Sequence, residues 1–144
     1  MEDRFASLDG VVDAVSGYMG GHRDDPTYEQ VCSGATGHAE VVEIRYDPQQ
    51  VSYPDLVKLF FTLHDPTTPD QQGHNVGSQY RSMVFCNDAV EMEQVEQEMS
   101  RLQENMTFGS RSFCTQVVSP VPTFWRAEEY HQDYHKKHRG FCSR

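Results

Sequence analysis

The 144-residue sequence lacks any apolar run approaching the roughly 18 residues that a membrane-spanning helix needs. Its N-terminus is acidic and has no hydrophobic signal-peptide core, which predicts a cytoplasmic location. Positive charge is also scarce, because 12 Lys and Arg residues against 22 Asp and Glu residues give a net charge of −10. Such a chain is poorly suited to nonspecific binding of phosphate backbones. We therefore expect neither a membrane nor a nucleic acid as a partner.

Cysteine is sparse as well, and its spacing argues against a zinc ribbon. Cys32, Cys86, Cys114 and Cys142 include no Cys-x-x-Cys pair. A reducing compartment also disfavours structural disulfides between them. Hydrophobic residues make up 37% of the chain and aromatic residues 11%, which is enough for one packed core at this length. No repeat, low-complexity tract or domain boundary is present, so residues 1–144 are expected to form a single domain.

Hydrophobic periodicity predicts alternating helices and strands, and hence an α+β fold. Helices are expected over residues 2–9, 52–65 and 89–106, and in the tail 127–144, ending near Gly140. Strands are expected over residues 11–18 and 39–46, and within 80–88 and 113–121. The second helix has the clearest start, because Ser52 can cap it and Pro54 suits its first turn. Segments 22–37 and 66–79 are rich in Gly, Pro and polar residues, which predicts loops.

Five motifs in a fixed order carry the most specific information: GYMGG, PTYEQVCSGATGHAEVVEIRYDP, LFFTLHDPT, QGHNVGSQYRS and AEEYHQDY. Together they closely resemble the A-type peptide methionine sulfoxide reductases over nearly the whole chain. The resemblance implies a ferredoxin-like two-layer sandwich with long loops. It implies an oxidoreductase for oxidised-protein repair, which reduces free or protein-bound methionine S-sulfoxide. Thioredoxin or another dithiol would be the reductant, without a metal or organic cofactor, and the protein would be a monomer unless another chain supplies a strand.

The resemblance also implies roles for individual residues. Glu40, in GHAE, matches the family's proton-donating Glu, and burial would raise the pKa of such an acid toward neutrality. Tyr28 and Tyr80 match the two tyrosines that donate to the sulfoxide oxygen, and Cys142 matches the resolving cysteine. In this chemistry a cysteine thiolate attacks the sulfoxide sulfur and becomes a sulfenic acid, which the resolving cysteine converts to a disulfide. Cys32 is interpreted as structural, Cys86 as a small core residue within a strand, and Cys114 as a strand residue.

The sequence departs from the family at two places. The family's GCFW motif, which carries the nucleophilic cysteine, is not among the 144 residues, and Met1 matches a position only a few residues after it. We therefore expect a chain without the first strand and unable to use the family mechanism as written. A late start, a selenocysteine codon read as a stop and a real truncation remain three open explanations. The second departure is Asn75, expected in the substrate site with Glu40 and the tyrosines, where the family usually has Asp.

Three alternative readings compete with an active reductase. The first is a catalytically inactive descendant that binds methionine sulfoxide or acts as a scaffold. The second is a zinc site in the tail, because four potential ligands have helix-compatible spacings: His131, His135, His138 and Cys142. The third is a Cys32–His38 dyad of the protease kind, for which no orienting partner is evident.

Overall fold

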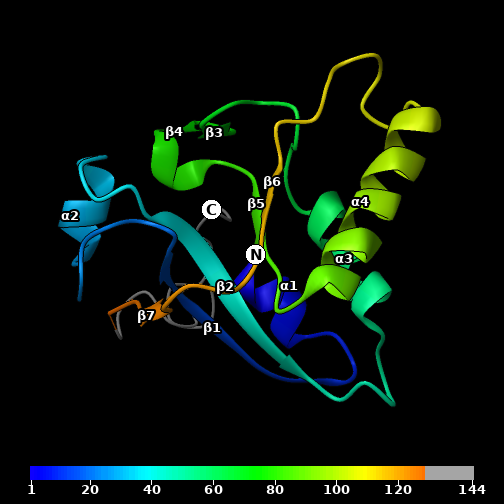
Figure 1. Cartoon of the computed structure of the whole chain (residues 1–144), viewed down its shortest axis with the longest axis horizontal. Helices are drawn as coiled ribbons and strands as arrows, with labels where there is room; N and C mark the ends of the chain where they lie inside the picture. Colours follow the sequence, from blue (N-terminus) through cyan, green and yellow to red (C-terminus); the bar gives the residue numbers. More distant parts are fainter. Residues whose placement is uncertain (129–144) are drawn as a thin grey trace.

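Helices and strands alternate along a computed structural model that describes residues 1–128 (Figure 1). The helices are α1 (Glu2–Ala6), α2 (Tyr28–Cys32), α3 (Tyr53–Thr62) and α4 (Ala89–Glu104), with a 3₁₀ turn, η1 (Ser78–Tyr80). The strands are β1 (Val11–Met19), β2 (Ala39–Tyr46), β3 (Gln71–Gln72), β4 (Asn75–Val76), β5 (Met83–Phe85), β6 (Gln116–Val118) and β7 (Trp125–Arg126). The mixed α and β architecture agrees with the prediction.

The longest pairing joins β1 and β2 in antiparallel register over nearly their whole length. Tyr18 lies opposite Glu40 in this register, and β7 adds a short third strand on the other edge of β1. A separate parallel pair, β5 and β6, lies between this long ribbon and helices α3 and α4 in the view of Figure 1. The described strands thus form three separate small sheets, so the continuous ferredoxin-like sheet and its missing first strand stay predictions.

The helix starts follow the capping chemistry in the sequence. The Ser52 hydroxyl accepts a hydrogen bond of 3.2 Å from the backbone N–H of Asp55 and so caps α3, with Pro54 in the first turn. Asp88 caps α4 in the same way, accepting from the backbone N–H of Glu91 at 2.9 Å. Both helices were predicted, and both are confirmed to within a few residues at their ends.

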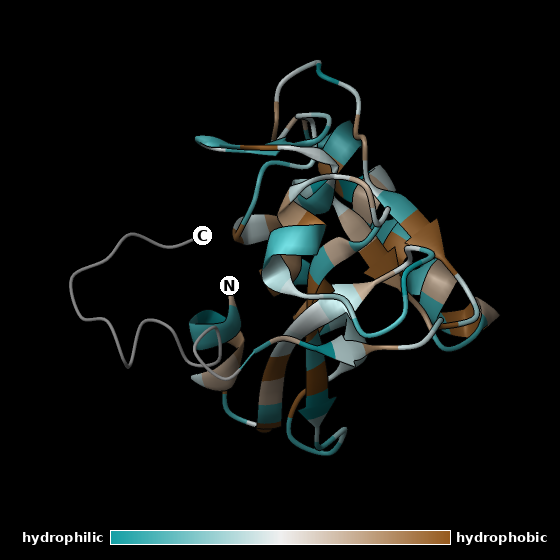
Figure 2. Ribbon diagram, turned by 90° about the vertical axis from the view of Figure 1, so that its left-hand side faces the viewer, coloured by the Kyte–Doolittle hydropathy of each residue, from teal (hydrophilic) through white to brown (hydrophobic). Residues whose placement is uncertain are grey.

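The core consists of two main clusters of buried side chains. One joins α3 and α4 to the parallel strand pair and contains Val57, Phe61, Cys86, Val95 and Leu102. The other joins α1, β1 and α3 and contains Phe5, Ala14, Val51 and Leu56. Figure 2 shows hydrophobic residues gathered on the strands and inner helical segments, while the outlying turns are hydrophilic. Cys86 is fully buried in the first cluster, in agreement with its interpretation as a core residue.

Two predicted loops contain regular structure. Segment 22–37 includes α2, which begins with a capping box between Thr27 and Gln30 that the sequence already carried as Thr-x-x-Gln. Segment 66–79 includes the β3–β4 hairpin and most of η1. β7 was not predicted, because two residues are too few for a period-2 pattern to show.

The predictions for the C-terminal third of the chain are met only in part or fall on residues that the structure does not describe. The last predicted strand is reduced to β6, and Cys114 precedes it as an exposed residue, so its assignment to a strand is wrong. The predicted tail helix falls almost entirely on residues 129–144, which the structure does not describe. In residues 1–128, none of the helices has the length and apolar character needed to cross a membrane.

Candidate active site

Tyr28 is the first residue of α2, and a carboxylate holds it in place through its backbone. The Tyr28 N–H donates to Oε2 of Glu128 at 3.0 Å, while the Tyr18 hydroxyl donates to Oε1 of the same carboxylate at 3.2 Å. Glu128 follows β7 and therefore links three segments of the chain, namely β1, α2 and the end of the described residues. A negative charge at the first turn of a helix also satisfies N–H groups that have no partner within the helix.

The Tyr28 side chain meets a thiol and a second phenol. Cys32 lies four residues later on the same face of α2. The pKa of Tyr28 is raised well above its ordinary value. The largest cause is a hydrogen bond to Cys32, the next is burial, and the third is the interaction with Tyr80, through its charge and a hydrogen bond. The Tyr28 hydroxyl therefore keeps its proton at neutral pH and can donate it in a hydrogen bond. Cys32 is exposed beside the phenols, and its interpretation as a structural residue stays a prediction.

Tyr80 closes the 3₁₀ turn η1, which packs against β2. Its backbone N–H donates to the carbonyl of Gly77 at 3.0 Å, and Gln79 beside it is buried at 4% exposure. Gly77 has φ of 143°, a conformation that favours glycine and permits the tight entry into the turn. Tyr80 thus reaches Tyr28 from a part of the chain distant in sequence.

Glu40 is the second residue of β2, the strand against which η1 packs, and it is partly buried. The turn that leads into β2 is fixed by His38, whose Nδ1 accepts from the Gly21 N–H at 3.0 Å. The other ring nitrogen, Nε2, donates to the carbonyl of Arg23 at 2.6 Å. Both nitrogens of His38 are therefore committed to the backbone, which excludes a dyad with Cys32. What the described contacts bring together instead is two phenols and a thiol, with Glu40 on the strand against which the turn of Tyr80 packs.

The remaining predicted residues are not gathered with this group by any described contact. Asn75 begins β4, pairs with Gln72 and is partly buried, five positions before Tyr80. Cys142 and the three histidines of the zinc alternative lie outside the described residues. Sequence reasoning missed Arg81 and Glu128, although both stand inside the motifs QYRS and AEEY.

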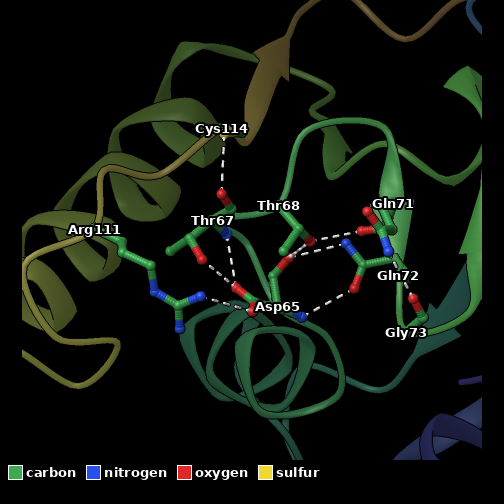
Figure 3. Close-up of polar contacts among 8 residues, drawn as sticks. All are labelled: Asp65, Thr67, Thr68, Gln71, Gln72, Gly73, Arg111 and Cys114. Atoms are coloured by element: carbon green, nitrogen blue, oxygen red, sulfur yellow. Dashed lines mark hydrogen bonds and ion pairs between the residues drawn. The ribbon is translucent and has the colours of Figure 1, made fainter.

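Asp65, in the motif HDPT, organises the loop that runs from α3 toward η1 (Figure 3). Its Oδ1 accepts from both the N–H and the hydroxyl of Thr67, at 2.9 and 2.5 Å, and Arg111 lies 3.6 Å from Oδ2. The Gln72 side chain pairs with the backbone N–H and carbonyl of Asp65, each at 2.9 Å. Burial alone would raise the pKa of Asp65, but the hydrogen bonds from Thr67 and the charge of Arg111 lower it overall. This cluster therefore holds the loop in shape.

His64, next to Asp65, begins a directional chain of hydrogen bonds. Its Nδ1 lies 2.8 Å from the Phe60 carbonyl, and its Nε2 lies 2.7 Å from the hydroxyl of Ser82. Because a carbonyl can only accept, Nδ1 carries the proton, and in neutral His64 Nε2 accepts from Ser82. The Ser82 oxygen is also 2.7 Å from the hydroxyl of Thr115, which donates to it in this arrangement. These hydrogen bonds join the end of α3 to the segments that lead into β5 and β6.

Protonation of His64 should make the protein less stable in mild acid. Burial lowers the pKa of His64 below its ordinary value near 6.5, with Phe60 and Asp65 opposing that shift. The unfolded chain therefore takes up a proton at a pH where the folded chain does not, so stability falls as pH drops below about 6.5. Urea unfolding of wild type and His64→Gln at pH 7.5 and 5.0 should show a smaller pH-dependent loss in the variant. His74→Gln, at an exposed histidine, is the control, and an unchanged loss in His64→Gln would contradict the assignment.

The sequence comparisons agree with the motifs. The family model described as peptide methionine sulfoxide reductase matches residues 1–143. The peptide methionine sulfoxide reductase MsrA of Methanothermobacter thermautotrophicus is 47% identical over 137 residues, which cover 95% of this chain and 80% of that protein. The MsrA of Geobacter metallireducens is 46% identical over 143 residues, covering 97% of this chain and 85% of that protein.

Solved structures share the fold as well. Mxr1 from Saccharomyces cerevisiae in reduced form superposes with a TM-score of 0.84 at 33% identity, covering 94% of this chain and 76% of that one. Methionine sulfoxide reductase A of Corynebacterium diphtheriae gives 0.83 at 33% identity, with coverages of 98% and 71%. The fold and the site thus define a class of protein, the reductases of oxidised sulfur. In this chain, an α+β fold brings two phenols and a thiol together beside the strand that bears Glu40. The chain belongs to the peptide methionine sulfoxide reductase family.

Proposed function

We propose that the chain reduces methionine S-sulfoxide, free or within proteins, and that Glu40, Tyr28 and Tyr80 serve the sulfoxide oxygen. The chemical class follows from the family, which makes the chain an oxidoreductase that acts on methionine sulfoxide. The observation that carries the residue assignment is the contact between Tyr28 and Tyr80 beside the strand that bears Glu40. Two protonated hydroxyls and one carboxylic acid are the donors that a departing oxygen needs.

The proposed reaction transfers one oxygen atom and two electrons. A cysteine thiolate attacks the sulfoxide sulfur and forms an S–S bond. The oxygen, once protonated, moves to the cysteine sulfur as the S–O bond to methionine and the S–S bond break, so methionine leaves reduced and the cysteine is left as a sulfenic acid. Glu40 supplies the proton to the oxygen, while the phenols hold it. Asn75 donates its amide to the substrate without adding charge. Cys142 then attacks the sulfenic sulfur, water leaves, and a dithiol, with thioredoxin as the proposed physiological donor, reduces the disulfide.

The family nucleophile belongs to the GCFW motif, which the 144 residues do not contain. We propose that a ferredoxin-like core would need one more strand beside β2 and β5, since each pairs with only one strand in the described part of the chain. The segment that carries GCFW in the family would supply both that strand and the thiolate. We further propose a cytoplasmic monomer that works without a metal or organic cofactor.

The two phenols provide the test of the site. With the family's GCFW segment joined ahead of Met1 and dithiothreitol as reductant, Tyr28→Phe and Tyr80→Phe should each lower the reduction rate about 5- to 10-fold. The double variant should lose more than either single variant, because one hydroxyl partly replaces the other. The rate is measured with N-acetyl-methionine S-sulfoxide, and the R epimer serves as the control substrate.

The inactive alternative makes a different prediction for the same protein. A binding protein or scaffold would take up the S-sulfoxide in calorimetry without forming methionine. If all three tyrosine variants reduced the sulfoxide at the wild-type rate, the phenols would have no role in the reaction. If the S and R epimers were reduced at equal rates, the proposed preference for the S epimer would be wrong.

A further inference from the structure

Arg81 lies between the two halves of the proposed site and has no role in the chemistry above. Its side chain folds back over η1, where NH1 donates to the Ser78 carbonyl at 2.7 Å. Its NH2 group donates to the carbonyl of Gly37 at 2.8 Å. Gly37 stands three residues before Glu40, at the entry to β2. One guanidinium thus bridges the turn that carries Tyr80 and the turn that introduces Glu40.

The second anchor of this bridge is itself held firmly. Thr36, beside Gly37, accepts from the N–H of His22 at 2.9 Å through its carbonyl. His38, on the other side, is clamped through both ring nitrogens. Gly37 has φ of 75°, a left-handed conformation that fixes the direction of its carbonyl. Arg81 therefore ties the less regular element, η1, to a rigid point at the start of β2.

The charge of Arg81 is not used for an ion pair in the described part of the chain. Its partners there are neutral carbonyls, and none of the ion pairs among residues 1–128 includes it. It is half-buried, and burial lowers its pKa while the charge of Asp70 raises it. A half-buried cation that makes two charge-assisted bonds to backbone carbonyls supplies geometric precision, because the planar fork fixes both acceptors at once.

We propose that Arg81 is a positioning residue that sets the Tyr80 hydroxyl relative to the Glu40 carboxyl. The inference rests on the proposed roles of those two residues. Donors to a developing charge must be placed within about 0.5 Å, and a displacement of about 1 Å can cost roughly 100-fold in rate. Arg81 acts through Tyr80 and does not touch the reacting atoms.

Hydrogen exchange on the chain as it stands tests the positioning directly. The Tyr80 N–H donates to Gly77 and the Arg81 N–H to Ser78, both within η1. In Arg81→Gln these two amides should exchange about 10-fold faster or more, whereas amides around buried Val95 in α4 should not change. Arg101→Gln, at an arginine that pairs with Glu98 on the same helix, α4, is the matched control and should leave η1 unaffected. Unchanged exchange in η1 of Arg81→Gln would overturn the proposal.

A double-mutant cycle separates positioning from general support. In the sulfoxide assay Arg81→Gln should lower kcat/KM about 10- to 100-fold, and Arg81→Lys should lose less, because lysine keeps the charge but not the fork. In the Tyr80→Phe background, Arg81→Gln should lower kcat/KM by less than about 3-fold, because the hydroxyl that Arg81 positions is already absent. An equal cost in both backgrounds would overturn the proposal. A Tyr80→Phe variant with full activity would refute the role of Tyr80 instead, and the exchange of the η1 amides would still decide whether Arg81 holds the turn.

Discussion

Glu40→Gln is expected to lower the rate of sulfoxide reduction by about 100- to 10,000-fold, the range that general acid catalysis typically contributes. Glutamine keeps the size of the side chain and its hydrogen-bonding capacity but cannot deliver a proton. Because the oxygen is protonated in the transition state, the loss should fall on the chemical step and leave substrate binding nearly unchanged. The effect should exceed that of either tyrosine variant, since the two phenols partly replace each other whereas the proposed mechanism assigns the proton transfer to Glu40 alone.

The measurement is single-turnover formation of the sulfenic acid, in a chain that carries the family's GCFW segment ahead of Met1. Glu43→Gln is the matched control, because Glu43 lies three residues further along β2, on the opposite face, and pairs with Arg45 at 3.8 Å. The control should stay within about 2-fold of wild type, as surface ion pairs contribute little. An unchanged rate in Glu40→Gln would leave Glu40 as a structural carboxylate at the end of a strand.

The elements with strong periodicity could be read from the sequence. The strand 11–18, with its glycine stop, corresponds to β1, and 39–46 coincides with β2. The caps Ser52 and Asp88 mark the starts of α3 and α4 because capping is a local interaction between neighbours in sequence. Short elements such as α2, β3 and β7 leave too few residues for a period to show, so tertiary contacts decide them.

The candidate site was only partly visible in the sequence, for a similar reason. The motifs identify which residues are special, and Tyr28 and Tyr80 do meet in the structure. They do not reveal the supports of the site, because Arg81 and Glu128 act on backbone groups far away in sequence. A carbonyl or N–H at a distant position has no side-chain signature, so only the fold shows that a given Arg or Glu reaches it.

Gly21→Ala is expected to destabilise the protein by about 3 kcal/mol, toward the upper end of typical overpacking costs. A Cβ at this position would stand 2.3 Å from the Thr36 carbonyl oxygen and 2.5 Å from the His38 backbone nitrogen. Both are backbone atoms, which cannot rotate away as a flexible side chain could. The Gly21 N–H also donates to His38, so any shift that relieves the overlap weakens the clamp on the turn before Glu40. Stability and sulfoxide reduction should therefore fall together.

Urea unfolding at 25 °C measures the change in the free energy of unfolding. The control Gly34→Ala distinguishes steric overlap of the added Cβ from the strain of a positive φ. Gly34 has φ of 78° and no atom within 4 Å of its added Cβ, so its substitution should cost only the strain of a left-handed alanine, about 1–2 kcal/mol. Gly21 is not among the positive-φ glycines, so its cost comes from the close approach of the segment Thr36–His38. A Gly21→Ala protein as stable as wild type would show that the two segments can separate without loss. The last glycine of GYMGG would then need another explanation than its close approach to Thr36 and His38.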